Sequence, residues 1–106
     1  MHITTEEGLK GLEKTSQAFL ELFKHGSLNV EIYKPELHDK QTPHDRDEIY
    51  VIIAGSGVFV NDGHKVNFKA GDFLFVPAGI AHRFSNFTTD FSTWVFFYGP
   101  EGGELT

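Results

Sequence analysis

Glycine turns at short intervals are the feature that most constrains the fold of this chain. From residue 48 to residue 98, short segments rich in Val, Ile and Phe alternate with turns, most of which contain Gly. Because β-branched and aromatic residues favour strands and Gly favours turns, each segment is predicted to form one strand. The predicted strands are 48–54, 58–60, 65–68, 73–76, 82–85 and 91–98. Such a series indicates an all-β sandwich or barrel.

The first 33 residues are predicted to form a short helix and then a β-hairpin. Thr4 stands three residues before Glu7, which is the spacing of a capping box and predicts a helix over about residues 5–14. From Gln17 onward, side chains alternate with a period of two residues, which predicts strands over 17–24 and 28–33. A helix over 17–24 is an alternative, because a short apolar run fits both periods.

The length of 106 residues supports one domain with one hydrophobic core. We expect residues 1–16 to form an N-terminal extension, residues 17–98 to form the barrel and residues 99–106 to form a tail. The Gly and Pro residues after Tyr98 explain why the last strand ends there.

Composition and charge exclude several classes of protein. The 15 acidic and 9 basic residues give a net charge of −6, so a nucleic-acid partner is not expected. The chain has no Cys, which excludes disulfides, thiolate metal sites and a cysteine nucleophile. No apolar run approaches the roughly 20 residues of a membrane span, and no signal peptide opens the chain. We therefore expect no membrane partner and a cytoplasmic location.

Two spaced motifs carry a resemblance to a known family. The first is His44, three residues, Glu48, six residues and Gly55. The second, after 15 intervening residues, places Gly71, Pro77, Gly79, His82 and Asn86 at fixed spacing. Together they resemble the motifs of the cupin superfamily, and the resemblance covers about residues 28–98. It implies a cupin jelly-roll β-barrel, also called a double-stranded β-helix, here with a short N-terminal helix.

The resemblance also implies a metal site, with one departure from the family pattern. Typical cupins hold a divalent metal with three His and one Glu, and this chain offers His44, Glu48 and His82. The first motif His falls at Thr42, and either Gln41 or Thr42 is a possible fourth ligand. The expected cofactor is a divalent transition metal: Fe, Mn, Ni, Cu or Zn.

The chemistry of these side chains is consistent with metal binding. Imidazole nitrogen suits Fe, Ni, Cu and Zn, and two imidazoles with one carboxylate resemble the facial set of non-haem iron oxygenases. The alternative is that His44 and Glu48 are exposed and that His82 simply bonds a backbone carbonyl. Residues four apart in an extended chain point to the same side, so His44 and Glu48 can both face a barrel interior.

Aromatic residues on the same strands predict a small apolar pocket. Tyr50 shares the strand face of Glu48, and Phe84 shares that of His82. Together with Trp94 and Phe96 from the last strand, they form the expected substrate pocket. Two alternatives are that the other face of the last strand points inward and that these rings simply fill the core.

The most specific functional hypothesis is a dioxygenase-type metalloenzyme acting on a small organic molecule. Glu48 would bind the metal and shuttle a proton, and Tyr50 would orient the substrate, so these two are the catalytic candidates. The alternatives are a non-catalytic module that binds a small metabolite or sugar, and an isomerase or epimerase that needs no metal. A homodimer is expected from the resemblance.

Overall fold

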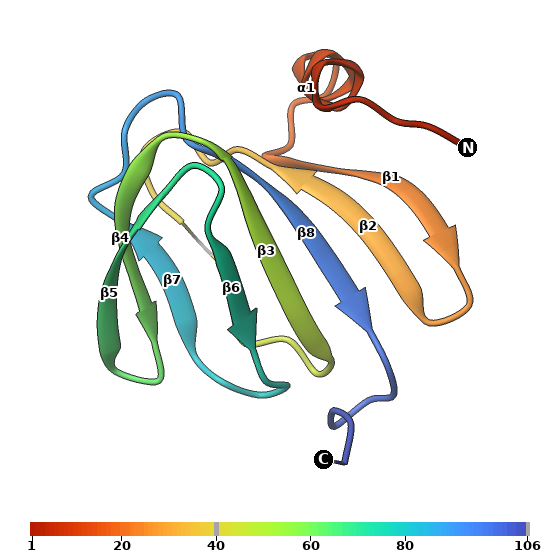
Figure 1. The fold of residues 1–106 in the computed structure, drawn as a ribbon, viewed down its shortest axis with the longest axis vertical. Helices are drawn as coiled ribbons and strands as arrows, with labels where there is room; N and C mark the ends of the chain where they lie inside the picture. The colour runs from red at the N-terminus through yellow and green to blue at the C-terminus, as the bar shows by residue number, and fades with distance from the viewer. Residues whose placement is uncertain (40, 106) are drawn as a thin grey trace.

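The protein folds into two facing antiparallel β-sheets with one helix outside them (Figure 1). The computed structural model describes residues 1–39 and 41–105. Thr106, the last residue of the predicted tail, lies outside them. The elements are α1 (Thr5–Glu13), β1 (Phe19–His25), β2 (Leu28–Tyr33), β3 (Asp47–Ala54), β4 (Ser56–Asn61), β5 (His64–Lys69), β6 (Phe73–Val76), β7 (His82–Ser85) and β8 (Ser92–Tyr98). The predicted all-β jelly roll is confirmed.

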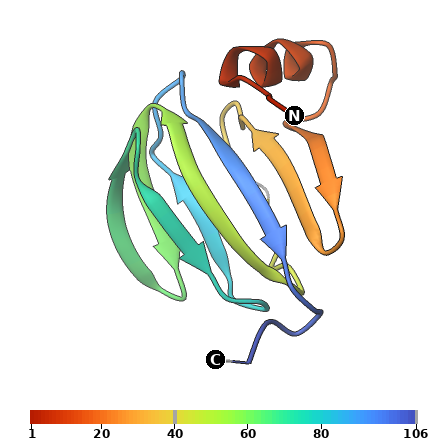
Figure 2. The ribbon, with the colours of Figure 1, turned by 45° about the vertical axis from the view of Figure 1, so that its right-hand side comes forward.

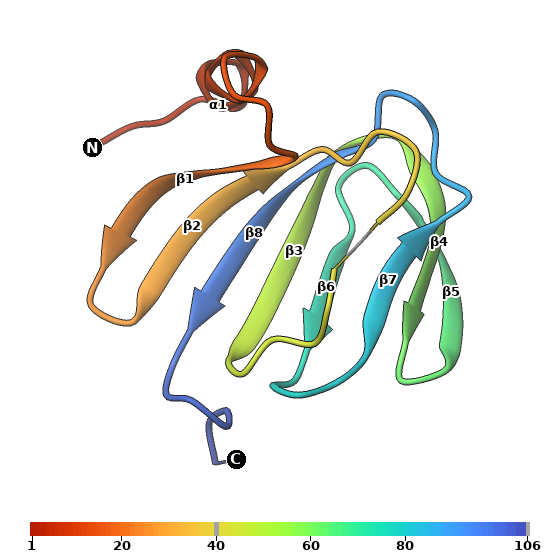
Figure 3. The ribbon, with the colours of Figure 1, turned by 180° about the vertical axis from the view of Figure 1, so that it is seen from behind.

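The two sheets differ in width. The larger has the strand order β1-β2-β8-β3-β6, and the smaller has the order β5-β4-β7. Seen from behind in Figure 3, the smaller sheet faces β3 and β6, whereas β1 and β2 extend beyond it. The buried core between the sheets consists mainly of Tyr50, Ile52, Phe59, Phe68, Val76, Phe84, Phe91 and Val95. The barrel is therefore packed at one side and open beside the β1–β2 hairpin.

Helix α1 begins with the predicted capping box. The Glu7 backbone N–H donates to Thr4 Oγ1 at 3.0 Å, and the Thr4 N–H donates to the Glu7 carboxylate at 3.4 Å. The helix lies over the β1–β2 hairpin (Figure 2). A Cβ atom at Gly8 would lie only 3.1 Å from side-chain carbons of Leu22 and Ile32, so the glycine that weakens the helix also lets it approach the sheet closely.

The segment 19–25 is a strand rather than a helix. It pairs with β2 in an antiparallel hairpin, and a bulge lies between Glu21 and Phe23. The short apolar run fits both the helical and the strand period, and its hydrogen bonds with β2 select the strand.

The tail after β8 folds back onto the beginning of β3. The Asp47 carboxylate is buried and accepts hydrogen bonds from the Glu104 N–H at 2.8 Å and from the Ala78 N–H at 2.9 Å. Residue 47 thus joins the tail, the turn before β7 and the strand that carries Glu48. In the described part of the chain, the single helix is far too short to cross a membrane.

Candidate metal centre

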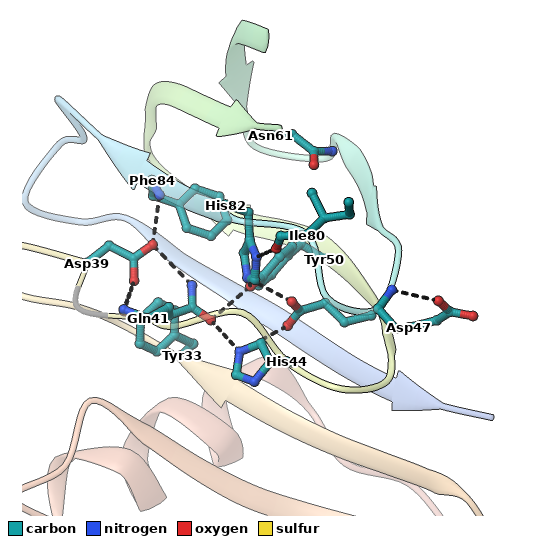
Figure 4. Close-up of polar contacts among 12 residues, drawn as sticks. Tyr33, Asp39, Gln41, His44, Asp47, Tyr50, Asn61, Ile80, His82 and Phe84 are labelled. Carbon is teal, nitrogen blue, oxygen red and sulfur yellow. Dashed lines mark hydrogen bonds and ion pairs between the residues drawn. The ribbon is translucent and has the colours of Figure 1, made fainter. Parts of the chain in front are cut away.

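The three predicted ligands come together inside the barrel, from three different parts of the chain. Glu48 lies on β3 of the larger sheet, His82 begins β7 of the smaller sheet, and His44 lies in the loop before β3. The loop is fixed near β7 because the Gly79 N–H donates to the His44 carbonyl at 2.6 Å. The two sheets and the loop therefore all direct a side chain to one point, where Figure 4 shows His44 and His82.

The separations of the candidate ligand atoms are close to those around one metal ion. His82 Nε2 lies 2.8 Å from Glu48 Oε1, and His44 Nε2 lies 3.9 Å from Glu48 Oε2. One ligand atom from each of the three residues lies within 4.8 Å of the other two. An ion that holds its ligands at about 2.1 Å keeps neighbouring donor atoms about 3.0–3.4 Å apart. The site needs only small adjustments to hold a divalent transition metal.

Glu48 is a buried carboxylate whose close contact is an imidazole nitrogen. The residue is 0% exposed, and its Oε1 lies 2.8 Å from His82 Nε2, which pairs with it only when that nitrogen carries a proton. Burial of an unpaired carboxylate costs on the order of several kcal/mol. The carboxylate is not an exposed residue at the start of a strand, and its charge calls for a cation beside it.

The ring of His82 is oriented by a backbone carbonyl. Its Nδ1 lies 2.9 Å from the Ile80 carbonyl oxygen, an acceptor that fixes Nδ1 as the protonated nitrogen. Nε2 then faces the Glu48 carboxylate and the Tyr50 hydroxyl. Burial opposes the charged form of His82, but Glu48 and the Ile80 carbonyl raise its pKa on balance. Either a proton or a metal ion therefore belongs between His82 and Glu48.

Further acidic groups lie on the β1–β2 hairpin of the larger sheet. Glu31 of β2 lies opposite Glu21 of β1 in the hairpin register. Burial and the charges of Glu21 and Glu48 raise the pKa of Glu31. The negative potential of these groups favours a cation near Glu48.

The hydroxyl of Tyr50 lies behind the candidate ligands. Tyr50 is 0% exposed, and its hydroxyl donates to Gln41 Oε1 at 2.9 Å. Burial and the charge of Glu48 raise its pKa well above the ordinary value, so the phenol remains a hydrogen-bond donor. Tyr50 does share the interior face of Glu48, but it contacts the ligand residues and does not line the open groove described below.

Gln41 and Thr42, the two possible fourth ligands, differ in orientation. Thr42 is exposed, whereas Gln41 Oε1 lies 3.3 Å from His44 Nε2. Asp39 also belongs to the site, since its carboxylate contacts both the side chain and the backbone of Gln41. No motif marks Asp39, because its role depends on how the loop folds back onto β7.

A groove of about 1560 Å³ leads from the solvent to this site. Tyr33, Val95 and Phe97 line it, together with Gln41 and His44 of the candidate site. Polar residues of the loop after β2 and residues of α1 and β1 complete the lining. The uncovered inner face of the β1–β2 hairpin therefore becomes the entrance to the site.

None of the four aromatic residues predicted to form the substrate pocket lines this groove. Phe84 is 2% exposed and packs against Tyr50, with 4.9 Å between the ring centroids, so it belongs to the core. Trp94 and Phe96 lie on the outer face of β8, in a hollow shared with Met1 and Ile3.

The register of β8 explains the outward position of Trp94 and Phe96. Val95 pairs with both Glu31 and Tyr50, which places Val95 and Phe97 on the inner face. Both faces of β8 are aromatic or aliphatic, so alternation in the sequence does not reveal which one points inward.

Fold and site together can be compared with known proteins. The family profile described as "Cupin domain" matches residues 29–98. The chain belongs to the cupin family. The match includes the two sheets from β2 to β8 and all three candidate ligands, but it leaves α1 and β1 outside.

Several proteins are similar to this cupin. An uncharacterized protein of Streptomyces coelicolor is 29% identical over 86 residues, which cover 79% of this chain and 82% of that protein. An acireductone dioxygenase of Leishmania major is 32% identical over 106 residues, with 84% of this chain and 30% of the dioxygenase covered. An oxalate-binding protein of Thermotoga maritima is 46% identical over 39 residues, with 37% of this chain and 32% of that protein covered. The cupin thus spans about a third of these last two relatives.

Solved structures share the fold at low sequence identity. A protein from Neisseria meningitidis superposes with a TM-score of 0.73 at 18% identity, covering 93% of this cupin and 100% of that chain. The superposition extends the fold similarity beyond residues 29–98 to most of the chain.

Proposed function

We propose that this cupin binds a divalent transition metal through His44 Nε2, Glu48 and His82 Nε2 and catalyses a dioxygenase-type reaction on a small organic molecule. The observation that carries the metal proposal is the buried Glu48 carboxylate, whose oxygens lie 2.8 Å from His82 Nε2 and 3.9 Å from His44 Nε2. Two nitrogens and one carboxylate oxygen suit Fe, Mn, Ni, Cu or Zn.

The reaction type is supported by one relative and by the chemistry of the ligand set. The protein that is similar over 84% of this chain is an acireductone dioxygenase. When bound, the metal would activate O₂ or polarise a bidentate oxygen substrate. Glu48 would hold the metal and exchange a proton with the substrate, since it is the only carboxylate among the three ligands.

The surrounding residues supply binding and orientation. A small organic molecule would enter through the groove and contact Tyr33, Val95 and Phe97. The Tyr50 hydroxyl would act through Gln41 and His82, to which it is hydrogen-bonded, rather than contact the substrate.

Elemental analysis tests the metal proposal. Protein purified without a His tag should carry one equivalent of transition metal or take it up after chelation. His82→Ala should lose this metal, whereas His64→Ala, at an exposed position on β5, should retain it. Wild-type protein that neither carries nor takes up metal would overturn the proposal.

Oxygen uptake tests the reaction. The Fe(II)-loaded protein should consume O₂ with at least one member of a panel of diketones, phenols and small thiols, and His82→Ala should not. Metal binding without oxygen uptake would support the second candidate, a non-catalytic module that binds a small metabolite. The similarity to an oxalate-binding protein over 39 residues favours that candidate, and oxalate is therefore included as a binding probe.

A further inference from the structure

The family's first motif His has no counterpart in the barrel of this protein. The residue at that position, Thr42, is exposed at the rim of the groove. The side chain of its neighbour Gln41 turns inward instead, and its Oε1 lies 3.3 Å from His44 Nε2 and 2.9 Å from the Tyr50 hydroxyl. A neutral oxygen therefore lies beside the candidate metal ligands (Figure 4).

Asp39 holds this carboxamide in place. Its Oδ2 accepts the Gln41 side-chain amide at 3.1 Å and the Phe84 backbone N–H of β7 at 2.7 Å. Its Oδ1 accepts the Tyr33 hydroxyl of β2 at 2.7 Å and the Gln41 backbone N–H at 3.1 Å. The carboxylate thus connects the loop to both sheets and fixes Gln41 at two points.

These contacts also determine which end of the Gln41 amide faces the site. An ionised carboxylate only accepts hydrogen bonds, so Asp39 requires the NH₂ group of Gln41 on its side. The carbonyl oxygen must then face His44 and Tyr50. The Tyr50 hydroxyl donates to one lone pair of this oxygen, and the other faces His44 Nε2 at 3.3 Å. That second lone pair becomes free when His44 Nε2 gives up its proton to bind a metal.

We propose that Gln41 Oε1 is the fourth protein ligand of the metal and that Asp39 is the positioning residue that aims it. The inference rests on the proposed metal site. Its ligand set would be two imidazole nitrogens, one carboxylate oxygen and one amide oxygen. Compared with three His and one Glu, this set has one more hard oxygen ligand, which favours Mn and Fe relative to Cu and Zn.

Cobalt titration of the chelated, untagged full chain tests this inference without an activity assay. Gln41→Ala should weaken Co²⁺ binding about tenfold or more and change the visible d–d absorption, because one ligand is lost. Thr42→Ala is the matched control from the adjacent position and should leave both unchanged. Gln41→His should bind Zn²⁺ more tightly relative to Mn²⁺ than wild type does.

The positioning role of Asp39 has its own signature. An Asn at this position has one acceptor oxygen where Asp has two, so it cannot accept all four hydrogen bonds. Asp39→Asn should therefore produce the same change in the Co²⁺ spectrum as Gln41→Ala, and it should add no further loss of affinity in a Gln41→Ala background. If Asp39→Asn does not fold, Gln41→Ala still decides the ligand assignment.

The outcomes separate the two proposals. Suppose that wild type binds Co²⁺ and that Gln41→Ala binds it with an affinity within twofold of wild type and with the same spectrum. Gln41 is then not a ligand, and only this inference fails. If Asp39→Asn changes the affinity of a Gln41→Ala protein further, Asp39 does not act through Gln41. If wild type binds no metal, the proposed function fails and this inference fails with it.

Discussion

His82 Nε2 lies 2.8 Å from Glu48 Oε1, although the two residues belong to opposite sheets of the barrel. The approach of these two atoms makes the site part of the core rather than a surface cluster. Both side chains are buried, so whatever lies between them must be small and positively charged. A proton and a metal ion both meet that condition, and they compete for the same position.

The first prediction concerns the metal-free protein. Because the pKa of His82 is raised in the folded state, its protonated form stabilises the fold fully below the unfolded value of about 6.5. This stability is lost as the pH rises through the folded pKa. The free energy of unfolding of chelated protein, measured by urea titration, should therefore fall as the pH is raised from about 6 to 9. His64→Ala should keep this dependence and His82→Gln should lose it, whereas identical profiles for wild type and His82→Gln would contradict the assignment.

The second prediction concerns tyrosine ionisation. Burial raises the pKa of both Tyr33 and Tyr50, with further contributions from Asp39 to the former and from Glu48 to the latter. Neither phenol should ionise in the folded protein at pH 10, the ordinary tyrosine value. Absorbance at alkaline pH should show both ionising only with unfolding, and Tyr33→Phe and Tyr50→Phe should each remove one phenolate from that transition. Ionisation of Tyr50 in folded protein would mean that its hydroxyl is not buried.

The third prediction distinguishes groove from core. Since the chain has no Cys, a single introduced thiol reports the accessibility of its position. Phe97→Cys, on the groove wall, should react with a thiol reagent about tenfold or more faster than Phe84→Cys in folded protein. Both should react at the same rate in urea. Equal rates under native conditions would show that Phe97 does not line an open groove.

The fourth prediction concerns the tail. Asp47→Ala leaves the Ala78 and Glu104 N–H groups without their acceptor and should lower the free energy of unfolding by about 1–3 kcal/mol. Hydrogen exchange should become faster at these two amides. Asp45→Ala, at an exposed neighbouring position, is the control and should change neither quantity.

The sequence predicts the fold well because the turns are locally encoded. Asp62 and Gly63 both adopt positive φ angles, 52° and 80°, which a two-residue hairpin turn requires and which Asp-Gly sequences favour. The strands on either side then follow from the turn, and the resemblance to the cupin motifs implies that His44, Glu48 and His82 are neighbours.

The rest of the site depends on contacts that sequence patterns do not encode. The inner face of β8 is set by its register against β2 and β3, since both of its faces are apolar. The inward turn of Gln41 depends on Asp39, and Asp39 is fixed by Tyr33 and by the backbone of Phe84, 45 residues away. Such long-range hydrogen bonds leave no periodic signal along the chain.

Because the larger sheet extends beyond the smaller one, the candidate metal ligands and much of the groove wall come from different parts of the chain. The three candidate metal ligands lie within residues 29–98, which match the cupin family, whereas much of the groove wall comes from residues 9–19, which precede that match. Exchange of the first 28 residues between related cupins would therefore replace part of the groove wall and leave the three candidate ligands in place. In this architecture, the lining of the groove can vary while the candidate metal centre stays the same.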